Sequence, residues 1–254
     1  MKALIVRPQP SAEELYRALQ KLGVASECCP VVSFTFSPLS LSSLEHLTIC
    51  DIIIAVSQPA VRFTHQALLQ KNKRWPQTAR YFAVGAKTAS CLQKLTQQSA
   101  SSPQSEDTEG LLELLASESL NGKEGIKGKK IAILRGDSGR ELLFDSLQNL
   151  NAKTVYIESY SRHWTGFDGE VQVKHWQSTG IDHLIVTSFE QLKFFTQQIP
   201  THRKNWLHSL ELMVPSTRVA QLALQLGFTQ VHNINGASNQ AIMDSIQGEL
   251  HRKI

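Results

Sequence analysis

The sequence predicts an α/β protein with parallel sheets, and three observations support this prediction. Short apolar strands alternate with helical patterns along the whole chain of 254 residues. The strands are continuous aliphatic runs, such as ALIV at 3–6, which are typical of strands buried in a parallel sheet. The connections are short, which favours parallel crossovers. The strand and helix pairs that we expect are 51–56 with 59–70, 81–84 with 87–95, 131–134 with 139–149, 183–187 with 189–198, 211–214 with 217–226, and 231–234 with 238–250.

Local signals define the ends of the helices. Ser11 with Glu14 three residues later predicts a capping box at the start of the first helix. Gly23 follows the last apolar residue of that helix, where a C-terminal cap is expected. Asp107 or Thr108 is expected to begin a helix that covers 109–116.

Two stretches depart from the alternation. Residues 28–36 and 154–163 have an extended pattern, and we expect no helix to follow either at the usual distance. Polar segments rich in glycine or serine at 97–108 and 119–130 predict loops.

The two halves of the chain resemble each other. DIIIAVS at 51–57 and DHLIVTS at 182–188 both run from Asp through aliphatic residues to Ser. Arg7 and Arg135 both end a strand, and a third strand pair matches at nearly the same separation. Such colinear matches favour a duplicated α/β unit of about half the chain. The alternative explanation for these matches is that all α/β segments resemble one another, without any duplication.

Composition and charge exclude several classes. Hydrophobic residues make up 41% and charged residues 19%, which excludes collagen, coiled coils and disorder. The longest aliphatic run, 52–56, is far shorter than the ~20 residues of a membrane span, so we expect no membrane association. The 26 Lys and Arg exceed the 22 Asp and Glu without forming a polybasic block. We therefore expect a small anionic ligand and no nucleic acid.

Cysteine and histidine usage indicates neither a disulfide framework nor a metal site. Two of the four cysteines are adjacent, and no CxxC or HxxxH spacing occurs. The N-terminal apolar run is too short for a signal peptide. We expect a cytoplasmic protein with reduced thiols and no metal.

Candidate binding residues follow the strands. Ligands of parallel sheets bind beyond the carboxyl ends of the strands, where helix N-termini favour carboxylates and phosphates. The segments at these positions are SQP at 57–59, GAKT at 85–88, RGDSGR at 135–140, TS at 187–188 and PSTR at 215–218. For any single segment, ordinary helix caps and tight turns are the favoured interpretation, but five such segments in two similar halves favour a binding role. No dinucleotide, P-loop or nucleophile-elbow motif is present.

Arginines supply the natural partners for carboxylates. Arg7 and Arg135 end strands, and Arg140 and Arg218 begin helices. The alternative for each is a solvated charge at a helix end. Tyr160, in an extended segment, is either a proton donor or a packing residue.

These segments together resemble the uroporphyrinogen-III synthase family over essentially the whole chain. The resemblance rests on the order and spacing of LIVRP at 4–8, AVSQPAV at 55–61, YFAVGAKTA at 81–89, EGLL at 109–112, LRGDSGREL at 134–142, YSR at 160–162, VTS at 186–188 and VPSTRVA at 214–220. Each motif alone is weak, because the family is divergent.

The resemblance implies two small Rossmann-like or flavodoxin-like lobes with parallel sheets, joined by a two-stranded β-ladder. One lobe is expected to be discontinuous, from 1–33 plus 164–254, and the other to cover 34–163. The ladder strands are expected near 28–36 and 154–163. The duplicated unit and the lobes are therefore expected to be out of phase.

The family's reaction converts linear hydroxymethylbilane to cyclic uroporphyrinogen III in tetrapyrrole and haem biosynthesis. Water leaves, the last pyrrole ring is inverted, and no cofactor takes part. The resemblance implies Tyr160 as the candidate proton donor in a cleft between the lobes. The implied substrate contacts are Arg7, Ser57, Gln58, Lys87, Thr88, Arg135, Gly136, Arg140, Ser188, Ser216 and Arg218. Where many members have a glycine-containing turn and a second threonine, this chain has Pro215–Arg218 as PSTR, so Ser216 and Thr217 remain alternatives for the hydroxyl.

The main rival hypothesis is a two-lobed module that binds an anionic metabolite without chemistry. A nucleotide-dependent enzyme without its glycine motif is a second rival. We also expect a monomer that makes transient contact with hydroxymethylbilane synthase, the enzyme that supplies the substrate.

Overall fold

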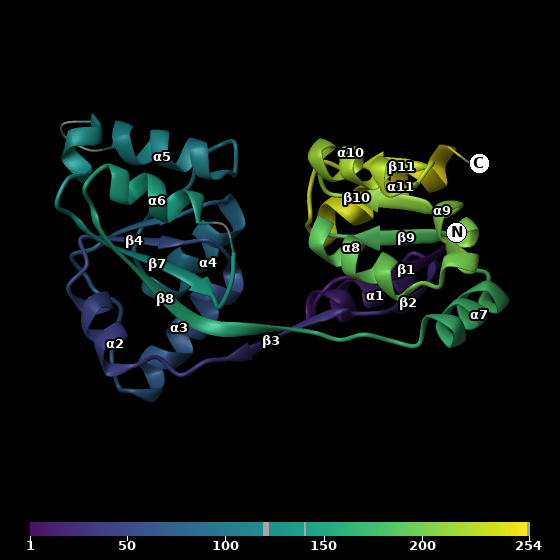
Figure 1. Ribbon diagram of the computed structural model, residues 1–254, viewed down its shortest axis with the longest axis horizontal. Coiled ribbons are helices and arrows are strands. Elements are labelled where there is room, and N and C mark those ends of the chain that lie inside the picture. The colour runs from purple at the N-terminus through teal and green to yellow at the C-terminus, as the bar shows by residue number, and fades with distance from the viewer. Residues whose placement is uncertain (119–121, 140, 253–254) are drawn as a thin grey trace. The chain divides into compact units, whose positions relative to one another are not determined.

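The computed structural model describes residues 1–118, 122–139 and 141–252, and it confirms the α/β class (Figure 1). The chain divides into two compact units. Unit 1 consists of 1–33 and 163–254, and unit 2 consists of 34–162.

Unit 1 is built on a five-stranded parallel sheet in the order β11-β10-β9-β1-β2. In chain order this is a 2-1-3-4-5 sheet, so the direction of winding reverses between β1 and β9. Its strands are β1 (Lys2–Val6), β2 (Ala25–Cys28), β9 (His183–Val186), β10 (Glu211–Val214) and β11 (Val231–Asn233).

Helices cover both faces of this sheet because β1 is apolar on both sides. Ala3 and Ile5 pack on a cluster with α1 and α11, while Leu4 and Val6 pack on a cluster that contains Trp176. The helices are α1 (Ser11–Lys21), α7 (Gly169–Thr179), α8 (Phe189–Gln198), α9 (Lys204–His208), α10 (Thr217–Gln225) and α11 (Asn239–Arg252), with a short 3₁₀ turn at Thr201–Arg203.

Unit 2 contains a six-stranded sheet in the order β3-β8-β7-β4-β5-β6. The five strands from β8 to β6 are parallel, and the winding reverses between β4 and β7. The strands are β3 (Val32–Phe36), β4 (Ile52–Ala55), β5 (Arg80–Ala83), β6 (Ala100–Ser101), β7 (Lys130–Gly136) and β8 (Lys153–Trp164). The helices are α2 (Leu41–Thr48), α3 (Gln58–Gln70), α4 (Ala86–Thr96), α5 (Thr108–Ser117) and α6 (Leu142–Asn149), with a 3₁₀ turn at Gly122–Ile126.

The predicted ladder is the pairing of β3 with β8. The Ser37 amide donates to the Ser159 carbonyl over 2.9 Å, and the Thr165 amide donates to the Val31 carbonyl over 3.0 Å. The earlier residue of one strand thus pairs with the later residue of the other, so β3 and β8 are antiparallel. This pairing makes the sheet of unit 2 a mixed one.

Several local predictions are wrong. Ser11 makes no capping bond, and the Gln9 side chain accepts from the Glu13 amide at 3.1 Å instead. The segment 28–36 is not one strand, because β2 ends at Cys28 and β3 begins at Val32.

Helices also follow both extended segments, contrary to prediction. The helix α2 comes after β3 and α7 comes after β8, but each buries few apolar side chains, so the pattern in the sequence is faint. The helix predicted over 139–149 begins only at Leu142.

A tight contact at Gly169 positions α7. A Cβ atom on Gly169 would lie 1.9 Å from the carbonyl oxygen of Gln198 and 2.9 Å from Cδ of Pro200. We expect Gly169→Ala to lower the free energy of unfolding by about 2–3 kcal/mol, because the backbone contact must open. Urea denaturation would measure the change.

Gly248→Ala is the matched control. A Cβ atom there meets nothing within 4 Å, and the residue lies inside α11. This substitution should raise the free energy of unfolding by about 0.5–1 kcal/mol. Equal effects of the two substitutions would contradict the contact at Gly169.

Candidate functional site

The structure brings the predicted residues to the carboxyl edge of each sheet, where the winding reverses. In unit 1, Val6 of β1 pairs with Val186 of β9, so Arg7 and Ser188 follow at the same edge. In unit 2, Ala55 of β4 pairs with Leu134 of β7, which places Ser57 level with Gly136. Such a reversal is where open α/β sheets bind ligands.

Three of the predicted serines are N-caps with nearly the same backbone conformation. Ser57, Ser188 and Ser216 begin α3, α8 and α10, with φ between −161° and −153°. Each hydroxyl accepts from the amide three residues later, over 3.2–3.4 Å. The capping interpretation is therefore confirmed for these serines. The first amides of each helix have no carbonyl partner in the helix, which leaves partial positive charge at the edge.

Tyr160 lies against this edge in unit 2. Its Oη is 3.2 Å from Oγ of Ser57, while its ring packs against Phe34 and Phe63 at centroid distances of 5.3 and 5.6 Å. The residue is 1% exposed, whereas Ser57 is half-buried. The phenol is therefore buried, and it forms a hydrogen bond with the more exposed Ser57 hydroxyl.

Gly136 is required for this placement. A Cβ atom on Gly136 would lie 2.6 Å from Cε2 of the Tyr160 ring. A β-bulge between Arg135 and Gly136 shifts the register, so that Gly136 pairs with Tyr160. Gly136 thus acts by admitting the ring.

Arg135 forms a cation–π contact and an ion pair within unit 2. Its guanidinium lies 4.2 Å from the Tyr156 ring and donates to the Glu141 carboxylate over 2.9 Å. Burial lowers the pKa of Arg135, but Glu141 outweighs this and holds that pKa above its ordinary value. Hydrogen bonds from Tyr156 and then Arg135 lower the pKa of Glu141. The positive charge of Arg135 is therefore balanced by the Glu141 carboxylate.

Arg7 is in the opposite situation. It is 8% exposed and donates to the Asn239 side chain, and its Nε has no hydrogen-bond partner among the described residues. No carboxylate in the described ranges forms an ion pair with it; burial lowers its pKa, and Glu14 partly opposes this. A buried guanidinium without an acidic partner is a strong candidate for binding an anion.

The remaining predicted site residues differ in how far their side chains are exposed to solvent. Gln58 is half-buried at the start of α3, Lys87 is exposed, and Thr88 is buried in the first turn of α4. Arg218 is exposed, and Arg140 lies outside the described residues.

Ser216 and Thr217 use their hydroxyls differently. Oγ of Ser216 caps α10, and Oγ1 of Thr217 accepts from the Asn233 side chain over 3.1 Å. Neither residue is buried.

Sequence reasoning missed one residue at this edge. The carboxylate of Glu106 accepts from the Ala86 amide over 2.8 Å, at the start of α4. The two residues are far apart along the chain, so no local pattern could reveal the contact.

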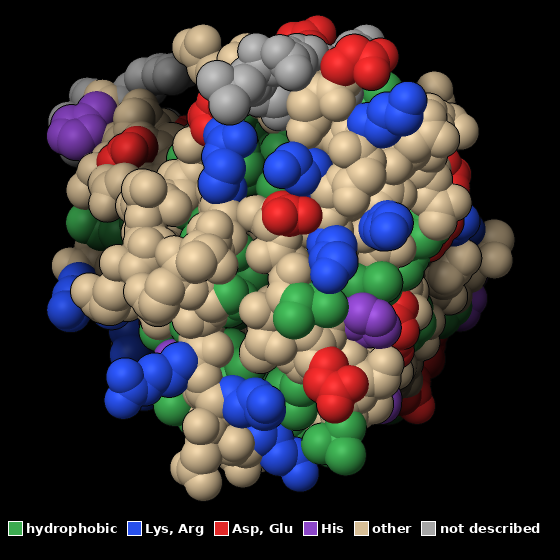
Figure 2. Space-filling view, turned by 90° about the vertical axis from the view of Figure 1, so that its left-hand side faces the viewer, with side chains coloured by type: hydrophobic (Ala, Val, Ile, Leu, Met, Phe, Trp, Pro, Cys, Tyr) green, Lys and Arg blue, Asp and Glu red, His purple; other side chains and the backbone are tan. Residues whose placement is uncertain are grey.

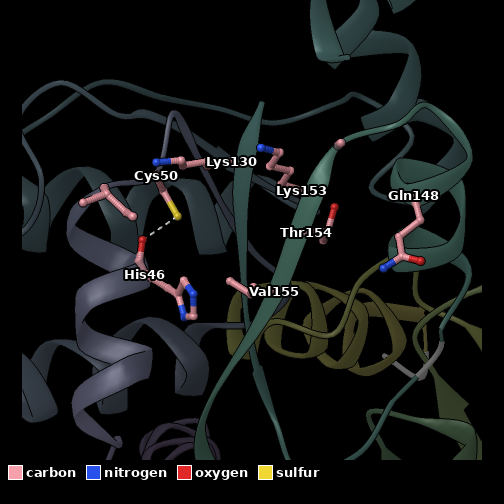
Figure 3. Close-up of a pocket in the computed structure, with 9 residues that line it drawn as sticks. His46, Cys50, Lys130, Gln148, Lys153, Thr154 and Val155 are labelled. Carbon is pink, nitrogen blue, oxygen red and sulfur yellow. Dashed lines mark hydrogen bonds between the residues drawn. The ribbon is translucent and has the colours of Figure 1, made fainter. Parts of the chain in front are cut away.

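A separate cavity of about 340 Å³ lies at the opposite edge of unit 2 (Figure 3). Lys130 and Lys153, which begin β7 and β8, line it together with His46, Cys50 and Gln148. Burial raises the pKa of the Cys50 thiol to about 11, so the thiol is protonated at neutral pH. The cavity contains none of the predicted site residues.

Charged side chains of both signs share one face of the molecule (Figure 2). On the face shown in Figure 2, Lys and Arg side chains are dispersed and interspersed with Asp and Glu. Among the described residues there is no group of three or more His, Cys, Asp or Glu placed to hold a metal ion. No helix in the described ranges is long and apolar enough to cross a membrane.

These features define a class: a protein of two α/β units with helix N-termini along the carboxyl edge of each sheet. A family model described as uroporphyrinogen-III synthase HemD matches residues 13–240. The uroporphyrinogen-III synthase of Escherichia coli K12 is 34% identical over 252 residues, covering 97% of this chain and 100% of its own. That of Proteus mirabilis is 30% identical over 76% of this chain and 96% of its own. The chain belongs to the uroporphyrinogen-III synthase family, which confirms the resemblance.

Solved structures agree on the fold. The uroporphyrinogen III synthase of Thermus thermophilus, a mutant form, matches with a TM-score of 0.66 at 15% identity, covering both chains completely. The enzyme of Helicobacter pylori 26695 matches with a TM-score of 0.58 at 16% identity, over 98% of this chain and 99% of its own.

Substitution of Arg7 separates a binding role from a structural one. We expect Arg7→Met to raise the free energy of unfolding by about 1–2 kcal/mol, because it removes a buried charge that forms no ion pair in the described part of the chain. The same substitution should weaken binding of polycarboxylates. Urea denaturation and ligand titration are the measurements.

Arg17→Met is the control, because exposed Arg17 pairs with Glu13 on the surface of α1 at 2.9 Å. It should change the free energy of unfolding by less than about 0.5 kcal/mol. A marked loss of stability in Arg7→Met would show that Arg7 serves the fold.

Proposed function

We propose that this chain converts hydroxymethylbilane to uroporphyrinogen III, with loss of water and inversion of the last pyrrole ring. The observation that carries the proposal is Arg7, a buried arginine that forms no ion pair among the described residues, at the reversal point of unit 1 beside the capped start of α8. A substrate with eight carboxylates suits such a position.

Both sheet edges contribute to substrate binding in this proposal. The amides that begin α3, α8 and α10 bind carboxylates, supported by Arg7, Gln58 and Lys87. Ser57, Ser188 and Ser216 hold these helix ends in place. We propose that Thr88, Gly136 and Arg218 make further substrate contacts at these edges. Because Arg135 is already paired with Glu141, we propose that it supports Tyr156 and β7 and binds substrate only if that pair opens.

Tyr160 supplies the proton that ionises the substrate. The hydroxymethyl C–O bond breaks as the proton passes from Tyr160 through the Ser57 hydroxyl to the departing oxygen, which leaves as water. The resulting azafulvenium carbon is attacked by a ring carbon of the last pyrrole, and the spiro intermediate rearranges to the inverted ring. The ring proton released at closure returns to the tyrosinate, so the balance is one water lost.

Restraint of the bilane determines which isomer forms. Unaided, the azafulvene closes without inversion to the symmetric isomer. Carboxylates fixed at several helix ends limit the conformations of the chain, so that the spiro-forming carbon is the nearest nucleophile.

The remaining features of the proposal concern organisation. We propose two functional lobes, 1–33 plus 164–254 and 34–163, in a monomer that works in the cytoplasm without a cofactor. Transient contact with hydroxymethylbilane synthase would limit loss of the unstable substrate.

Isomer analysis tests this function directly. Incubation with enzymatically generated hydroxymethylbilane, followed by oxidation and separation of the porphyrins, should give isomer III, whereas a buffer control should give isomer I. If both incubations give only isomer I while the chain binds uroporphyrin, the non-enzymatic binding module is the correct alternative.

Tyr160→Phe tests the proton donor. The ring and its packing remain, so kcat should fall about ten- to hundredfold with little change in KM. Tyr81→Phe is the control, since it removes a buried phenol that donates to the Pro76 carbonyl away from the site. Unchanged turnover in Tyr160→Phe would exclude Tyr160 as the acid.

A further inference from the structure

The start of α4 differs from the starts of α3, α8 and α10 because it binds a carboxylate that comes from a distant part of the chain. Oε1 of Glu106 accepts from the Ala86 amide at 2.8 Å, at the first position of α4. In the described part of the chain, the first amides of α3, α8 and α10 receive no acidic side chain. The proposed substrate contacts Lys87 and Thr88 lie in the turn that Glu106 covers.

Gly85 makes room for this carboxylate. A Cβ atom on Gly85 would lie 3.2 Å from Oε1 and 3.3 Å from Cδ of Glu106. The backbone of Gly85 has φ −140°, which any residue can adopt, so conformation does not require glycine there. Because glycine has no side chain, there is room at the start of α4 for the Glu106 carboxylate.

The Glu106 backbone is held in an unfavourable conformation. Its φ is 52°, in the left-handed region that residues with a side chain rarely adopt. The flanking residues are fixed, because Asp107 caps α5 through the Gly110 amide at 2.8 Å. The Glu106 side chain thus reaches α4 from a residue whose own backbone is left-handed and which lies next to the capped start of α5.

We propose that Glu106 occupies the position of a substrate carboxylate in the empty protein and must leave α4 before that carboxylate binds. This inference rests on the proposed function and names Glu106 as a residue that sets affinity for polycarboxylates. Because substrate and product both carry eight carboxylates, Glu106 competes with both. Its return to the Ala86 amide displaces a product carboxylate and favours release.

Removal of the competing carboxylate should tighten binding. In Glu106→Ala we expect KM for hydroxymethylbilane, and the Kd for uroporphyrin III measured by fluorescence, to fall by about three- to tenfold. A residue that only stabilises the start of α4 would leave both values unchanged or raise them when removed. Glu113→Ala is the control, because it removes an equal charge from an exposed position on α5 and should change neither value.

Glu106→Gln covers the case in which Glu106→Ala does not fold. The amide oxygen still accepts from Ala86 but carries no charge, so both constants should fall by a smaller factor. Unchanged or higher KM and Kd in the folded variants would overturn the proposal. Formation of isomer III by the wild-type chain is scored separately, so failure of the proposed function is distinguished from failure of this inference.

Discussion

The parallel register of the two sheets is the constraint on which the site depends. When neighbouring strands run in one direction, every helix that follows a strand begins at the same edge, and its first amides lack intrahelical partners. In unit 1 the starts of α8 and α10 lie in line because Ile185 pairs with Met213. In unit 2 the starts of α3 and α4 lie in line because Ala55 pairs with Ala83. Positive helix ends are therefore collected along an edge without any dense patch of lysine.

The two matching arginines show how a duplicated pattern acquires different roles. Arg7 and Arg135 hold corresponding places at the ends of β1 and β7, next to the reversal points of their sheets. Arg135 forms an ion pair with Glu141, whereas the described hydrogen bond of Arg7 is to the neutral side chain of Asn239. The residues around each arginine, which come from other elements, therefore decide which guanidinium is ion-paired.

Local chemistry was predictable from the sequence, and contacts between distant segments were not. Aliphatic runs located the central strands, and the N-cap of α5 was predicted at Asp107 or Thr108, of which Asp107 is the cap. The burial of Tyr160 depends on Phe34 and Phe63, which are far from it in sequence. The contact between Glu106 and Ala86 likewise depends on the packing of two loops. The helix α2 was missed because only Leu44 and Leu47 of its eight residues are buried.

The central claim is that polycarboxylates bind at the helix ends along the carboxyl edges. Backbone amide chemical shifts, recorded while the whole chain is titrated with uroporphyrin III, test it most directly. The account predicts the largest shifts at the amides of Gln58, Ala86, Phe189 and Thr217, the residues that begin α3, α4, α8 and α10. Shifts confined to the cavity lined by His46, Cys50, Lys130 and Lys153, with none at the helix ends, would contradict it.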